Sequence, residues 1–318
     1  MKTIARISAV LLLAVALLAA CQPQEVKKPP DQVTLQLNWL HGLDFTGYYV
    51  AEAQGFYADE NIAIAMTEGG IGITPYEPLL NQTADFAVLG FREHLTALDL
   101  KAQLVAVAAM YQLSPAVFFA LSDSGIQSPQ DMVGRKVAVK TESWRQTIHK
   151  TLGGAGVDPA DIIEVEIGPD EGIEMLYNGE VDVWTGYVLS EPIEAQMAGY
   201  NVNLIFPGEY IVSSYQGLLV IHRDTLDQRP DLVNRFVRAS LRGWRYAIEH
   251  LDETAEVMAE WQPDSSPEYL QTALRELTPL VDTGVPIGWI DADRWQQKMG
   301  EVYSAEQPGY TMQFVSEE

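Results

Sequence analysis

The 318-residue chain contains a single cysteine, Cys21, and this scarcity excludes several kinds of site. A disulfide framework needs at least two cysteines, and zinc sites built on thiolates use several. If Cys21 is covalently modified, as the neighbouring residues suggest, no thiol is left to act as a nucleophile. Cysteine chemistry is therefore not expected in the part of the chain that folds.

Motifs for metal, nucleotide or acyl-transfer chemistry are lacking as well. The chain has five histidines, and none falls in an HxxxH or HExxH spacing. No GxGxxG, GxxxxGK[ST] or GxSxG stretch occurs, and the glycine-rich segment 69–75 lacks the lysine of a phosphate loop. We therefore expect no metal, no cofactor and no catalytic residue, and the sequence carries no enzyme signature.

Basic residues are scarce relative to acidic ones. The chain has 20 Lys and Arg against 44 Asp and Glu, which gives a formal net charge of −24. A surface this acidic repels phosphate backbones and anionic lipid headgroups. Nucleic acid is therefore not expected as a partner.

Long apolar runs are rare, and the one that stands out lies at the start of the chain. Residues 7–18 are apolar or small and follow Lys2 and Arg6. This run is too short to span a bilayer comfortably, so residues 1–20 are predicted to be a signal peptide. The "LAAC" that ends at Cys21 has the form of a lipoprotein cleavage site, which predicts lipidation of Cys21. The alternative is an ordinary signal peptide that happens to contain a cysteine.

The segment 21–32 is polar and proline-bearing, so we interpret it as a tether between the lipid anchor and the folded domain. An anchor at Cys21 predicts attachment to the periplasmic face of a membrane, or to the cell surface in a Gram-positive host. Gln22 follows the cysteine, which favours the outer membrane in a Gram-negative host.

After the tether, strand and helix patterns alternate regularly. Residues 33–38 alternate apolar and polar side chains as a strand does, and residues 46–60 have the composition of a helix that ends near Gly55. The same alternation continues to about residue 111 and restarts near residue 120. This order predicts an α/β fold in which each lobe is a mainly parallel sheet flanked by helices.

A second complete unit interrupts the first, which predicts two lobes and two crossings between them. The expected division is 33–118 together with 215–318 for lobe 1, and 119–214 for lobe 2. We expect hinges at 119–122 and 212–217, and a helical tail up to the C-terminus. Clefts beyond the carboxyl ends of parallel strands are where α/β proteins bind small molecules.

Aromatic and polar side chains gather just after the predicted strands. Trp39, Trp144 and Trp184 each follow a strand, and flat rings on both lobes suit a planar heteroaromatic ligand. Packing in the core is the alternative for each tryptophan taken alone. Further candidate ligand contacts are Asn38, Asp44, Tyr48, Gly90, Gln112, Tyr187 and Glu191. Glu191 can accept hydrogen bonds from N–H groups or instead cap a helix. Of the neighbours Tyr48 and Tyr49, we expect Tyr48 to face the cleft.

Several segments, in order along the chain, resemble one family. The stretch "LQLNWLHGLDFTGYYVAEAQGFYADENI" at 35–62 resembles the opening of periplasmic binding proteins for thiamine pyrimidine precursors. The segments "ADFAVLG", "SDSGIQSPQDMVGRKVAV", "GEVDVWTGYVLSEP" and "YQGLLVIHRDTLDQRPDLVNRFVRASLRGWRYAIEH" resemble recurring segments of the same family. One departure is Gln82-Thr83, where relatives usually have a glycine.

The resemblance implies a type II periplasmic binding protein, a monomer that delivers a small molecule to the permease and ATPase of an ABC importer. By matching position it implies ligand contacts at Asn38, Trp39, Tyr48, Gly90, Trp184 and Glu191. The implied ligand is a thiamine pyrimidine precursor. Riboflavin or a sulfonate stays open, because neighbouring subfamilies handle those ligands.

Two other functions remain to be weighed. The family also includes fungal enzymes that synthesise the thiamine pyrimidine, and these carry a cysteine-rich motif that this chain does not have. A receptor that closes on its ligand and reports to a sensor would use the same cleft. The sequence does not separate that role from import.

Overall fold

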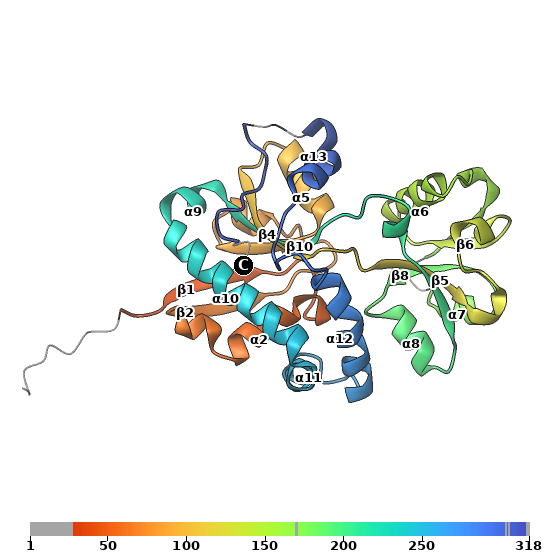
Figure 1. Ribbon diagram of the computed structural model, residues 1–318, viewed down its shortest axis with the longest axis horizontal. Helices are drawn as coiled ribbons and strands as arrows, with labels where there is room; N and C mark the ends of the chain where they lie inside the picture. The colour runs from red at the N-terminus through yellow and green to blue at the C-terminus, as the bar shows by residue number, and fades with distance from the viewer. Residues whose placement is uncertain (1–27, 169–170, 303, 305, 316–318) are drawn as a thin grey trace, which may run out of the picture. The chain divides into compact units, whose positions relative to one another are not determined.

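The computed structural model describes residues 28–168, 171–302, 304 and 306–315, and Cys21 lies outside this part of the chain (Figure 1). The largest sheet has five strands in the order β2-β1-β3-β10-β4. In that order the strands are Ile62–Thr67, Asp31–Gln36, Phe86–Leu89, Gln216–His222 and Leu104–Tyr111. We call this sheet, with the helices that pack on it, the first region.

The second region is built from two smaller sheets. A three-stranded sheet has the order β8-β5-β9, with strands Trp184–Tyr187, Ala116–Leu121 and Val202–Ile205. A two-stranded sheet pairs β6 (Lys136–Val139) with β7 (Ile163–Glu166) in parallel, and a bridge between Val137 and Val183 connects the two sheets. The helices here are α6 (Glu142–Gly154), α7 (Glu174–Tyr177) and α8 (Glu191–Met197).

The sheets are mixed, which corrects the expectation of mainly parallel sheets. Strand β3 is parallel to β1, but β10 runs antiparallel to both β3 and β4. Strand β5 is likewise antiparallel to β8 and β9. The pairing of Gln216 with Tyr111 explains the direction of β10, because the chain leaves β4 and enters β10 at the same edge. A strand that returns at the edge where its neighbour ends must run in the opposite direction.

The first region carries most of the helices. They are α2 (Thr46–Ala53), α3 (Phe56–Asp59), α4 (Glu77–Leu80), α5 (Phe91–Asp99), α9 (Arg223–Gln228), α10 (Pro230–Glu249), α11 (Leu251–Trp261), α12 (Pro267–Val281) and α13 (Ala292–Met299). Short 3-10 helices lie at Leu43–Phe45, Ser122–Ser124, Pro129–Met132, Pro159–Asp161, Pro207–Glu209 and Gly300–Val302. The expected helical tail is shorter than predicted, because residues 304 and 306–315 form no helix.

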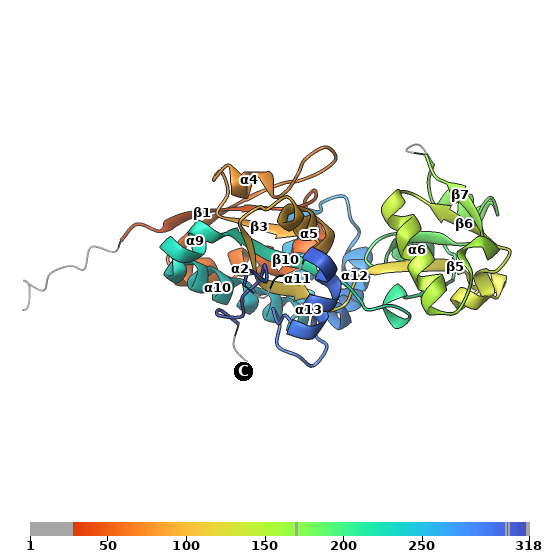
Figure 2. The same cartoon turned by 90° about the horizontal axis from the view of Figure 1, so that it is seen from above.

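The core of the first region covers both faces of its sheet. Val105 and Val107 of β4 belong to the apolar cluster that includes α2, α10 and α12, whereas Leu104 and Ala106 belong to the cluster with α5 and α13. This alternation is the period of two that a strand imposes on its side chains. Figure 2 shows α2 and α10 together on one side of the sheet and α4 on the other.

Helices α2 and α10 approach each other so closely that only glycine fits at their contact. A Cβ atom on Gly243 would lie 2.2 Å from the carbonyl oxygen of Gly47 and 2.5 Å from the Cβ of Ala51. A Cβ on Gly47 would lie 2.2 Å from the Trp244 ring. Real Cβ contacts are longer than this, so the two glycines fix the distance between the helices.

No helix in the described part of the chain is long and apolar enough to cross a membrane. Within the same residues, no group of three or more His, Cys, Asp or Glu side chains is arranged to hold a metal ion. The predicted division into two lobes, with its hinges, stays a prediction.

Candidate functional site

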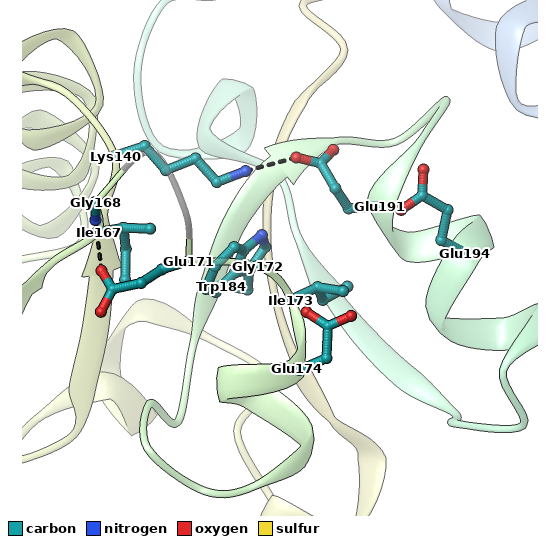
Figure 3. A pocket seen from close by; sticks show the side chains of 10 residues that line it. All are labelled: Lys140, Ile167, Gly168, Glu171, Gly172, Ile173, Glu174, Trp184, Glu191 and Glu194. Atoms are coloured by element: carbon teal, nitrogen blue, oxygen red, sulfur yellow. Dashed lines mark hydrogen bonds and ion pairs between the residues drawn. The ribbon is translucent and has the colours of Figure 1, made fainter.

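An open cavity of about 650 Å³ lies in the second region, in the size range of small-molecule sites. Figure 3 shows the side chains that line it. They are Lys140, Ile167, Gly168, Glu171, Gly172, Ile173, Glu174, Trp184, Glu191 and Glu194. The cavity therefore lies where β6 and β7 end, where β8 begins at Trp184, and at the starts of α7 and α8.

Glu191 is the most firmly held carboxylate in this cavity. Its Oε1 atom lies 2.5 Å from Nζ of Lys140, and its Oε2 atom accepts hydrogen bonds from the Tyr187 backbone N–H at 3.0 Å and the Ser190 hydroxyl at 2.5 Å. Burial opposes ionisation, but the charge of Lys140 and these hydrogen bonds hold the pKa of Glu191 below its usual value. The carboxylate is therefore ionised at neutral pH and fixed in position.

Gly186 explains why Glu191 reaches this position. A Cβ atom at residue 186 would lie 2.6 Å from Oε2 of Glu191 and 2.9 Å from Oε1. Because glycine has no Cβ, the carboxylate can lie against strand β8 and accept the Tyr187 N–H. The sequence Trp184-Thr185-Gly186-Tyr187 thus places a strand end and a carboxylate in direct contact.

Trp184 lines the cavity with little of its surface exposed. The residue is 2% exposed, and Nζ of Lys140 lies 4.9 Å from the centre of its ring. Its Nε1 atom has no hydrogen-bond partner among the residues that the structure describes. The ammonium of Lys140 lies over the ring, and the stacking of a flat ligand on this indole stays a prediction.

Trp144 and Tyr187 form an aromatic pair near the same strand end. Their ring centres are 5.4 Å apart with an angle of 58° between the planes. Tyr187 is 48% exposed, and Trp144 is partly exposed at the start of α6. Both rings are accessible to a flat ligand. Their role as ligand contacts stays a prediction.

In the first region, Asn38 and Gly90 hold a second carboxylate, Glu93. The Asn38 amide donates to Oε2 of Glu93 at 3.2 Å, and the Gly90 N–H donates to the same atom at 2.6 Å. Desolvation raises the pKa of Glu93 despite these two hydrogen bonds. Gly90 and Asn38 thus meet, as predicted for two site residues, but they meet through Glu93.

Asp44 lies in the 3-10 helix Leu43–Phe45, and its backbone oxygen accepts a hydrogen bond from the Tyr111 hydroxyl at 3.2 Å. The residue is accessible to solvent, yet desolvation by the surrounding protein raises the pKa of its carboxyl to about 6. A side chain that water reaches but protein surrounds is typical of a concave surface.

Carboxylates of both regions raise the pKa of the Tyr187 hydroxyl. Desolvation, followed by the charges of Asp44, Glu191 and Glu93, raises the pKa of Tyr187 to about 12. The pKa of Tyr269 on α12 is raised in the same way. Desolvation is the largest cause, followed by the charges of Glu194, Glu191 and Asp44, and together they bring this pKa to about 12. The structure therefore brings Asp44 into electrostatic range of Tyr187 and Tyr269.

Two predicted site residues, Tyr48 and Gln112, are buried inside the fold. The Tyr48 side chain is fully buried and packs edge-on against Trp244 at 5.8 Å, so the expectation that it faces a cleft is corrected. Its neighbour Tyr49 is equally buried and stacks on Trp261. Alternation fails here because the helix α2 is covered by α10 and α11 together.

Gln112 is also committed to internal hydrogen bonds. Its Nε2 atom donates to the carbonyl oxygens of Ala109 at 3.1 Å and Trp289 at 2.8 Å, and the residue is 4% exposed. This corrects its assignment as a ligand contact, because both amide protons are used inside the fold. Trp39, by contrast, is 49% exposed in the loop after β1, so its ring is available.

Sequence reasoning missed Lys140, Glu93 and the outer carboxylates Glu171, Glu174 and Glu194. Lys140 directly follows strand β6, so the rule that found Trp184 applies to it as well. Glu93 belongs to a capping box that starts at Gly90, a signal visible as a glycine and a glutamate three residues apart. The outer carboxylates carry no such signal in a chain this acidic.

The fold is that of a type II periplasmic binding protein. The structure is similar to the periplasmic aliphatic sulphonate binding protein from Escherichia coli, with a TM-score of 0.69 and 15% sequence identity over 85% of this chain and 89% of that chain. This confirms the predicted fold class. At this identity the similarity concerns the fold alone.

The chain belongs to the NMT1/THI5-like family, whose match covers residues 43–254. This confirms the resemblance inferred from the sequence segments. Among curated proteins, the chain is 28% identical to a riboflavin-binding protein from Chloroflexus aurantiacus over 240 residues, which are 74% of this chain and 68% of that protein.

Two further relatives carry names from thiamine metabolism. A formylaminopyrimidine-binding protein from Halalkalibacterium halodurans is 26% identical over 90% of both chains. A protein from Legionella pneumophila named 4-amino-5-hydroxymethyl-2-methylpyrimidine phosphate synthase is 28% identical over 85% of both chains. The relatives thus include proteins named for binding and a protein named for synthesis.

Proposed function

We propose that this protein is the substrate-binding component of an ABC importer and captures a small heteroaromatic compound, most simply a thiamine pyrimidine precursor. It binds the compound without converting it and passes it to a permease and an ATPase. It works outside the cytoplasm as a monomer, held to the membrane by a lipid on Cys21. The alternatives are a riboflavin- or sulfonate-binding protein, and a receptor that feeds a sensor.

One observation carries this proposal: a fixed carboxylate and a tryptophan meet at an open cavity of a binding-protein fold. Glu191 is held by Lys140 and the Tyr187 N–H, and Trp184 lines the same cavity. A carboxylate accepts hydrogen bonds from an exocyclic amino group, which an aminopyrimidine supplies.

The pyrimidine is favoured over the other ligands by charge. Sulfonates are anions, and the charged side chains that line the cavity are four glutamates and one lysine. Riboflavin is neutral, and the relative from Chloroflexus aurantiacus supports it as the second candidate. The relative named for formylaminopyrimidine matches more of the chain, which supports the pyrimidine.

A ligand titration of the purified soluble domain tests the proposal. Formylaminopyrimidine, 4-amino-5-hydroxymethyl-2-methylpyrimidine, riboflavin and an alkanesulfonate are added separately, and thermal unfolding and calorimetry are recorded. A ligand at one hundred times its Kd stabilises the folded state by about 2.7 kcal/mol. Recovery of the unchanged pyrimidine after denaturation is expected, and a converted product would contradict the binding role. If only riboflavin binds, the pyrimidine assignment is wrong.

The anchor and the partners are tested separately. The full-length chain and its Cys21→Ser variant are expressed in a bacterial host, and membrane and soluble fractions are compared. The proposal expects the wild type in membranes and the variant in the soluble periplasmic fraction. A permease and an ATPase encoded beside this gene favour import, whereas a sensor kinase favours signalling.

A further inference from the structure

Negatively charged side chains outnumber positively charged ones in the lining of the cavity. Lys140 is paired with Glu191 at 2.5 Å, and the remaining charged lining residues are Glu171, Glu174 and Glu194. The lining therefore has a formal net charge of −3. Figure 3 shows Glu174 and Glu194 on the side of the cavity away from Lys140.

The outer carboxylates interact with one another. Desolvation, followed by the negative charge of Glu191, raises the pKa of Glu194, and Glu174 adds to the effect in the same direction. Like charges in this range already oppose each other's ionisation. A further anion placed among them would meet the same repulsion, which solvent screens in part because Glu174 and Glu194 are exposed.

Trp184 supplies an independent sign that the cavity takes a ligand. The residue is 98% buried, since only 2% of it is exposed, and its Nε1–H finds no acceptor among the described residues. Figure 3 shows the indole nitrogen on the edge of the ring nearest the Lys140–Glu191 pair. A buried N–H without a partner is unfavourable, so an acceptor on a ligand would be favourable there.

From these two features we infer a specificity for this site, which rests on the proposed function. The cavity selects a neutral or cationic nitrogen heterocycle and rejects its phosphorylated or sulfonated forms. Trp184 donates its Nε1–H to an acceptor nitrogen on the ring. Glu174 and Glu194 determine specificity by repelling a phosphate or sulfonate at the outer end of the ligand.

The repulsion of a phosphate by Glu174 and Glu194 is tested with two ligands that differ by one phosphate. They are 4-amino-5-hydroxymethyl-2-methylpyrimidine and its phosphate ester, titrated by calorimetry against the wild type and the variants Glu174→Gln, Glu194→Gln and the double variant. We expect the wild type to prefer the alcohol at least tenfold. Each single substitution should improve binding of the phosphate about three- to tenfold and change binding of the alcohol less than twofold.

Glu256→Gln is the matched control, because Glu256 is exposed on α11 and makes the same change of charge away from the cavity. It should leave both affinities unchanged, and added salt should narrow the preference of the wild type. A wild type that binds the phosphate as tightly as the alcohol overturns the inference, and so does an equal gain from Glu256→Gln. If the wild type binds neither compound nor any other heterocycle of the earlier panel, the proposed function itself fails; if it binds formylaminopyrimidine alone, the proposed function stands and this inference is wrong for the alcohol.

The role of Trp184 is tested by the indole N–H signal. In ¹⁵N-labelled wild type, the alcohol should move the Nε1–H resonance of Trp184 downfield as the hydrogen bond forms. Trp184→Phe removes the donor together with part of the ring, so affinity for the alcohol should fall about tenfold, while the control Trp261→Phe on α11, outside the cavity lining, changes it less. An unmoved Trp184 resonance in the bound wild type overturns this assignment, whether or not the phenylalanine variant folds.

Discussion

The two regions use similar residues in opposite ways. In the first region Tyr48 lies in the helix that follows β1 and Gln112 directly follows β4, yet packing against Trp244 and hydrogen bonds to backbone oxygens enclose them. In the second region Trp184 and Glu191 also lie at a strand end, and they line an open cavity. Position after a strand is therefore not sufficient to place a side chain in a binding site.

The helices explain the difference. Helix α10 is 20 residues long and covers α2, so aromatic side chains there enter the core. Helices α7 and α8 have four and seven residues, and they leave the ends of β6 and β8 uncovered. The first region is therefore closely packed, whereas the second region carries the side chains that line the cavity. This comparison predicts that mutations in the two regions separate stability from binding.

The largest expected effect is on the stability of the first region. Gly243→Ala places a methyl group 2.2 Å from the Gly47 carbonyl oxygen and 2.9 Å from the Ala51 Cα, atoms that the backbone holds in place. Overpacking of this kind costs about 3 kcal/mol of unfolding free energy. Denaturant unfolding measures it, and ligand affinity of the folded fraction should stay the same.

Gly153→Ala in α6 is the control for this substitution. A Cβ at residue 153 meets nothing within 4 Å, so alanine should stabilise the helix by about 0.5–1 kcal/mol. If Gly243→Ala is as harmless as the control, the close packing of α2 on α10 does not determine stability.

A second effect in the first region depends on pH. His94 is fully buried, and desolvation lowers its pKa to about 4, although its hydrogen bond to the Gly309 carbonyl raises it slightly. The folded state therefore prefers the neutral ring. This stability is complete above the unfolded pKa of 6.5 and is lost as the pH falls toward 4. The full loss is about 3 kcal/mol.

The measurement compares wild type and His94→Gln in denaturant at several pH values. The difference between their unfolding free energies should shrink by about 3 kcal/mol from pH 7 to pH 4. His250→Gln, at an exposed position, should leave the pH profile unchanged. A constant difference across this range would show that His94 does not titrate with folding.

Much of the fold follows from the sequence alone. Alternation in 33–38 predicted β1, and the helix expected at 46–60 is present as α2 and α3, separated at Gly55 with φ of +74°. Local periodicity captures such elements because burial of one face determines it. The antiparallel direction of β10 was not predictable in this way, because it depends on where the chain re-enters the sheet.

The site was predictable only in part. Trp184, Tyr187 and Glu191 were found because each lies at or just after a strand, and the first and last of these line the cavity. Tyr48 was misplaced because helix-on-helix coverage is not visible in local sequence. Lys140 was missed because a lysine after a strand is common on a surface, and its partner Glu191 is 51 residues away.

The smallest expected effect on stability, and the clearest on binding, concerns Glu191. In Glu191→Gln the side chain keeps its size but loses the carboxylate. This carboxylate pairs with Lys140 and accepts the hydrogen bond of the Tyr187 N–H. Affinity for the pyrimidine should fall about tenfold to a hundredfold, as a lost charged hydrogen bond costs about 1.5–3 kcal/mol. Unfolding free energy should fall by only about 1 kcal/mol, because both side chains are partly exposed.

Glu142→Gln is the matched control, since Glu142 also pairs with a basic residue, Arg145 at 2.6 Å, but outside the cavity. Its side chain is 65% exposed, so both affinity and stability should stay within a few tenths of a kcal/mol of the wild type. Calorimetry and denaturant unfolding on the same samples give both quantities. A Glu191→Gln variant that loses stability but binds the pyrimidine normally would mean that the Lys140–Glu191 pair belongs to the framework, and that the two regions do not divide structure from binding.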